Sequence, residues 1–148
     1  MRRYRIVTVL LAAFALAACG GSTNNTTPTI TCTLPAGTGV SLIYPIANAT
    51  GVPDSLSSVI LAVAPPLPPG WQIVLGSSST TYFGGTLTTG LPVPLPTPVA
   101  PTPPGATPQY STFVGTGGLS GKTVYQVGLN NTNANCNSFP TFGSFTTQ

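Results

Sequence analysis

The sequence has very few ionisable side chains and no histidine. Its 148 residues include four Lys or Arg, one Asp or Glu and no His. A Ser-His-Asp triad is excluded, because it needs a histidine to carry the proton. Clustered Cys, His and carboxylate ligands for a metal are missing as well, and beyond residue 5 the chain has no arginine to clamp phosphate. We therefore expect a protein that is not an enzyme and that uses no metal or other cofactor.

The few charges are also unevenly placed. Arg2, Arg3 and Arg5 stand at the amino terminus, and the rest of the chain keeps only Asp54 and Lys122. The pI of about 9.0 therefore reflects the amino terminus, and no basic patch is left to bind a nucleic acid. Chemistry built on Lys122, as a Ser-Lys pair or a Lys-Asn crosslink helped by Asp54, remains an alternative. The surrounding LSGKT is more typical of a solvated turn.

An apolar run follows the arginines and ends at a cysteine. Residues 6–18 are apolar except for Thr8, and they are too few for a membrane-spanning helix, which needs about 20. A basic segment before a short apolar run is typical of a secretory signal peptide. The LAAC at 16–19 resembles the lipobox of bacterial lipoproteins. This resemblance implies that residues 1–18 are removed and that Cys19 carries a diacylglycerol and a further acyl chain such as palmitate. The alternative is an ordinary signal peptide with a cysteine near its cleavage site.

The residues after Cys19 suggest how the protein is held. Two or more acyl chains anchor a protein stably to a membrane. Gly20 and Gly21 follow Cys19, and Gly20 takes the second position, where the Gram-negative sorting pattern has Asp to retain a lipoprotein in the inner membrane. The resemblance thus implies the cell envelope, and the outer membrane in a Gram-negative host. Residues 20–31, GGSTNNTTPTIT, have no apolar periodicity and predict a flexible tether within the segment 19–35.

The remaining chain predicts an all-β domain. Helix formers are scarce, Thr, Val and aromatic residues are frequent, and Gly and Pro number 17 each. Short β-rich runs separated by turn residues predict strands at 39–45, 58–64, 71–76, 81–89, 109–115, 122–130 and 140–147. The proline series at 91–104 cannot lie inside a sheet, because each proline lacks a ladder donor. It is predicted to be a surface excursion, either a ligand for an aromatic groove or a stiff cover for a sheet edge.

Three segments resemble bacterial Ig-like and fibronectin type III domains. Residues 43–65, IYPIANATGVPDSLSSVILAVAP, are similar to the opening of the bacterial Ig-like pattern. Residues 119–127, LSGKTVYQV, resemble the corner before the penultimate strand, and 143–147, GSFTT, resemble the last strand. The resemblance implies an Ig-like β-sandwich of about seven strands over residues 36–148, without a shared catalytic site. The proline-rich insert at 91–108 departs from the pattern.

The Ig-like layout also bears on the cysteines and on the charges. It places the start of the first strand and the loop between the last two strands at one pole, so Cys32 and Cys136 can meet there. Export to an oxidising compartment favours a disulfide between them, and two unpaired thiols are the alternative. The layout places Asp54 and Lys122 at the opposite pole, where an exposed ion pair would stabilise the fold little.

The aromatic residues have two interpretations. In Ig-like domains a tryptophan at the position of Trp71 is often buried and a tyrosine at the position of Tyr125 forms a backbone-bonded corner. Trp71, Tyr82 and Tyr110, together with Tyr44 and Phe83, could instead offer rings to a sugar. We therefore expect an envelope module with a structural or protein-interaction role, held to the membrane through Cys19. The alternative is a glycan- or peptide-binding protein that uses exposed aromatics or the proline-rich loop.

Overall fold

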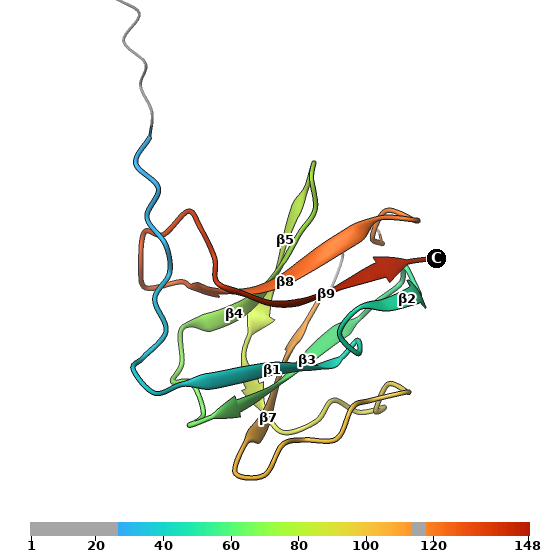
Figure 1. Ribbon diagram of the computed structural model, residues 1–148, viewed down its shortest axis with the longest axis horizontal. Helices are drawn as coiled ribbons and strands as arrows, with labels where there is room; N and C mark the ends of the chain where they lie inside the picture. The colour runs from blue at the N-terminus through green and yellow to red at the C-terminus, as the bar shows by residue number, and fades with distance from the viewer. Residues whose placement is uncertain (1–26, 114–117) are drawn as a thin grey trace, which may run out of the picture.

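A computed structural model describes residues 27–113 and 118–148 as two β-sheets packed face to face (Figure 1). The predicted signal peptide, Cys19 and the first part of the tether lie outside the described residues. The strands are β1 (Gly39–Tyr44), β2 (Ala49–Val52), β3 (Ser58–Ala64), β4 (Trp71–Gly76), β5 (Thr81–Thr86), β6 (Thr88–Thr89), β7 (Thr107–Thr112), β8 (Val124–Asn131) and β9 (Thr141–Thr147). Within these two ranges there is no helix long and apolar enough to cross a membrane.

The two sheets confirm the all-β sandwich. One sheet has the strand order β1-β3-β7-β6 and the other β2-β9-β8-β4-β5. Every pairing between named strands is antiparallel except β2 with β9, which is parallel. All seven predicted segments contain a strand, and two further strands were not predicted.

The two additional strands have different physical origins. β2 is short, contains Gly51 and buries only Val52 fully, so its sequence carries no alternation. The segment predicted as one strand at 81–89 is divided into β5 and β6, which belong to opposite sheets. A side chain at Gly84 would place its Cβ 2.7 Å from Cβ of Ser111, so glycine permits the close crossing from one sheet to the other.

The core lies between the sheets and follows the alternation of the strands. Trp71, Ile73 and Leu75 of β4 face inward, beside Tyr125 and the other inward residues of β8. Such alternation is expected where one face of a strand is buried and the other is not.

The proline-rich insert covers the outer face of the four-stranded sheet. Ile60 and Ala62 point away from the main core, yet both are buried, because Val99 and Ala100 of the insert pack against them. The Ala100 N–H also donates to the carbonyl of Ile43 at 2.9 Å, at the outer edge of β1. In Figure 1 the insert runs along the lower side of β3 and β7. The predicted cover for a sheet edge is thus mainly a cover for a sheet face, with one backbone contact to the edge strand β1.

Candidate functional site

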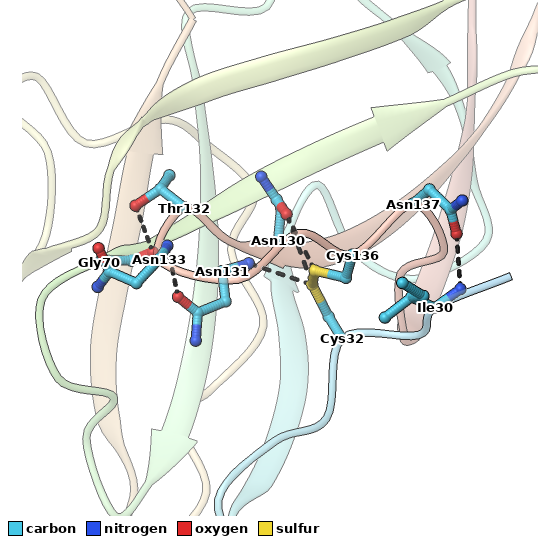
Figure 2. The surroundings of a disulfide bond; sticks show 9 residues. All are labelled: Ile30, Cys32, Gly70, Asn130, Asn131, Thr132, Asn133, Cys136 and Asn137. Carbon is cyan, nitrogen blue, oxygen red and sulfur yellow. Dashed lines mark hydrogen bonds between the residues drawn. A yellow bond between two sulfur atoms is a disulfide. The ribbon is translucent and has the colours of Figure 1, made fainter. Parts of the chain in front are cut away.

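We call the pole at which the amino-terminal segment joins the sandwich the attachment pole. It is built around a disulfide between Cys32 and Cys136. The two Cα atoms lie 5.3 Å apart, and 104 positions separate the cysteines in the sequence. Cys32 precedes β1 and Cys136 lies in the loop between β8 and β9, so the bond forms where the sandwich layout predicted it (Figure 2).

Polar contacts surround this bond. The backbone N–H of Asn131 lies 3.3 Å from Sγ of Cys32, and Oδ1 of Asn130 lies 3.5 Å from the same sulfur. Thr132 joins the neighbouring loop, because its N–H donates to the carbonyl of Gly70 at 2.7 Å and its hydroxyl donates there at 2.9 Å. The loops 65–70 and 131–139 thus lie together at one pole.

Residues 28–32 are fastened to this pole, although the sequence predicted a flexible tether up to residue 31. The Cys32 N–H donates to the carbonyl of Ser138 at 2.8 Å, and the N–H groups of Asn137 and Ser138 both donate to the carbonyl of Ile30. The side chain of Asn137 accepts from the Ile30 N–H at 2.8 Å and donates to the carbonyl of Pro28 at 3.1 Å. We call residues 28–32 with 136–138 the clip. The prediction of a flexible tether is therefore wrong for residues 28–31, which are held by the folded domain.

Asp54 and Lys122 lie at the other pole, near the end of the chain. Both Asp54 and Lys122 are exposed. The carbonyl of Asp54 accepts from the N–H of Leu119 at 2.7 Å, and the N–H of Lys122 donates to the carbonyl of Gln148 at 3.0 Å. The contacts that place these residues are thus backbone contacts, and the exposed side chains have no role in the core.

The three aromatic candidates do not form one surface. Trp71 is only 3% exposed and belongs to the core, so the interpretation of Trp71 as a ligand-stacking ring is wrong. Tyr82 packs inward against Tyr125, with ring centroids 6.0 Å apart. Tyr110 lies on the opposite sheet and packs against the cluster under the proline-rich insert. The alternation that points Trp71 and Tyr82 inward also explains why they do not meet Tyr110.

Two tyrosines have distinct environments. The hydroxyl of Tyr125 accepts from the N–H of Ser120 at 2.9 Å, so this side chain ties the preceding turn to the core. Tyr44 is half-buried beside the proline-rich insert, and burial raises its pKa above the ordinary 10.0. The Tyr44 hydroxyl therefore stays neutral near neutral pH.

A pair of phenylalanines that the sequence reasoning did not combine lies on the outer face of the five-stranded sheet. Phe83 of β5 and Phe139, just before β9, meet edge to face with centroids 5.9 Å apart. Phe83 of β5 pairs with Val74 of β4. Val74 points outward, because its neighbours Ile73 and Leu75 point into the core. Strict alternation along β4 and β5 identifies Phe83 as outward, whereas nothing local in the sequence brings Phe139 to it.

The parts of the chain that the structure describes contain no group of three or more Cys, His, Asp or Glu side chains that could hold a metal. Comparison with protein-family models, curated proteins and solved structures finds no match to this chain. The functional argument therefore depends on the residues themselves.

Proposed function

We propose that this protein is a lipid-anchored module of the bacterial cell envelope, in which an Ig-like sandwich is held to the membrane through Cys19 and has a structural or protein-interaction role without catalysis. In a Gram-negative host the membrane is the outer one. The observation that carries the proposal is the clip, because it fixes where the chain toward Cys19 leaves the folded domain.

The strand order supports the Ig-like assignment. Constant-type Ig domains pack an A-B-E-D sheet against a sheet of C, F and G. The order β1-β3-β7-β6 corresponds to A-B-E-D, and β4, β8 and β9 take the places of C, F and G. Tyr125, bonded through its hydroxyl to the backbone of Ser120, stands in the place of the corner tyrosine.

The attachment pole supports a defined orientation at the membrane. The disulfide and the clip hold residues 28–32 against the loop between β8 and β9, so pulling on the amino terminus loads this pole and not β1. Residues 20–27 then span at most about 30 Å between the lipid and the domain. The opposite pole, with Asp54, Lys122 and the C-terminus, faces away from the membrane.

Labelling of the protein in its native host tests the proposal. Cells fed an alkyne analogue of palmitate are expected to label the wild-type chain and not the Cys19→Ser variant. The matched control is the double variant Cys32→Ser, Cys136→Ser, which lacks two thiols but keeps the predicted acceptor and is expected to carry as much label as the wild type per amount of protein recovered. Label that persists in Cys19→Ser, or that disappears in the control, contradicts the proposal.

A further inference from the structure

The outer face of the five-stranded sheet carries a hollow beside the phenylalanine pair. Val74, Gly76 and Gly128 form its floor, and Thr81, Gln126 and Phe139 stand around it. A second, more open hollow shares Gly76 and Gln126 with the first and continues to Ser77 and Ser78. The two hollows together form one shallow trough over β4 and β8.

Gly76 keeps the trough open, although the fold does not require a glycine there. Gly76 pairs with Thr81 on one side and with Gln126 on the other, and a Cβ added to it would meet no atom within 4 Å. Gly128 differs, because an added Cβ would lie 2.9 Å from the carbonyl oxygen of Pro140. Glycine weakens a strand, and where packing does not explain it, it often marks the close approach of another molecule.

The trough has an aromatic side and a polar side. Phe83 is 50% exposed and, with Phe139, forms an apolar shelf beside the outward Val74. Thr81 of β5 and Gln126 of β8 both pair with Gly76, from opposite sides of β4. Two strand spacings, about 10 Å, therefore separate their backbones. A flat ring with one apolar face and polar edges fits between such groups.

The charges of the chain indicate that the ligand is neutral. Beyond residue 18 only Asp54 and Lys122 are charged, and of these only Lys122 borders the trough, at its far end. The polar groups around the floor are hydroxyls and an amide, which suit neutral hydroxyl-rich molecules. A protein partner is less suited to this surface, because the cores of protein interfaces are apolar and here the polar side chains that border the floor, Thr81 and Gln126, interrupt the surface between Phe83 and the next exposed apolar side chain, Val124.

We propose that this trough is a binding site for a neutral glycan. A sugar ring places its apolar face on the exposed ring of Phe83, which Phe139 meets edge to face, and its hydroxyls exchange hydrogen bonds with Thr81 and Gln126 over the open floor at Gly76. The site does not involve the lipid on Cys19, so it can be tested separately from the anchoring.

Titration calorimetry on the full-length protein in detergent micelles tests this site, with cellohexaose, mannohexaose and hexa-N-acetylchitohexaose as probes. At least one probe is expected to bind at concentrations up to about 10 mM. Phe83→Ala should weaken that binding about two- to tenfold, since aromatic contacts of this kind contribute that much. Gly76→Val should weaken it by more than about tenfold, because the new side chain fills the floor.

The Gly76→Val variant separates binding from folding. Valine is a good strand residue and has room at this position, so its unfolding temperature should equal or exceed that of the wild type. The matched control is Val93→Ser, at a residue 97% exposed in the proline-rich insert, which should bind as the wild type does. Absence of binding by all three probes overturns the glycan site, and so does binding that Gly76→Val leaves unchanged. A protein captured by the wild type and lost in Gly76→Val, without glycan binding, also overturns it in favour of a protein partner.

Discussion

Removal of the disulfide is expected to cost at least about a third of the stability of the domain. In the loop-entropy account, a crosslink closing about 100 residues stabilises the folded state by about 4.7 kcal/mol, and Cys32 and Cys136 are 104 positions apart. A domain of this size is usually stable by only about 5–15 kcal/mol in total. Serine is the appropriate replacement for both cysteines, because Oδ1 of Asn130 lies 3.5 Å from Sγ of Cys32 and can accept from a hydroxyl there.

Urea and thermal unfolding of the double variant Cys32→Ser, Cys136→Ser measure this contribution. At roughly 3–4 °C per kcal/mol the unfolding temperature should fall by about 15 °C. Wild-type protein treated with a thiol reductant is the matched control and should behave like the variant. A loss below about 1 kcal/mol in both samples would refute the reasoning, since the hydrogen bonds of the clip alone would then hold the attachment pole.

Three further perturbations test other parts of the fold. Gln109→Leu should cost about 2–4 kcal/mol in urea unfolding, because Gln109 is 2% exposed and its side chain pairs both backbone groups of Leu67, which would lose their partners; a cost below about 1 kcal/mol would contradict this. If the proline-rich insert seals the outer face, Ile60→Ala should lower the free energy of unfolding by about 2–5 kcal/mol. The exposed control Val93→Ala should change it by no more than about 0.5 kcal/mol, and equal effects of the two substitutions would contradict the cover. The free energy of unfolding should be flat from about pH 5 to 9 and fall above about pH 10. Burial raises the pKa of Tyr44 and favours its neutral form, so stability is lost as pH rises through the folded-state pKa. Tyr44→Phe should reduce the alkaline fall, and an unchanged pH profile in this variant would refute the assignment.

Local sequence patterns predicted most strands, since these depend on alternation and turn residues. The segment 58–64 was predicted as a strand and forms β3, yet its unbroken apolar run also indicates burial on both faces. What covers its second face could not be predicted, because the covering residues around Val99 lie more than thirty positions further along the chain.

Features that depend on distant pairing were the ones missed. The division of 81–89 into two strands depends on the close approach of Gly84 to Ser111, and the fastening of Ile30 depends on Asn137 at the other end of the chain. The disulfide was predicted only because the Ig-like resemblance supplied the spatial neighbours of Cys32. The sequence named Phe83 only as one of several rings that could bind a sugar, and its meeting with Phe139 required the three-dimensional structure.

The account depends most on the chemistry at Cys19. Mass spectrometry of the amino-terminal peptide, from protein extracted from membranes of its native host, tests it directly. We predict a peptide that begins at Cys19 and carries a diacylglycerol on its sulfur and an acyl group on its amine. A peptide with a free thiol at Cys19, or one still joined to residues 1–18, would contradict the account.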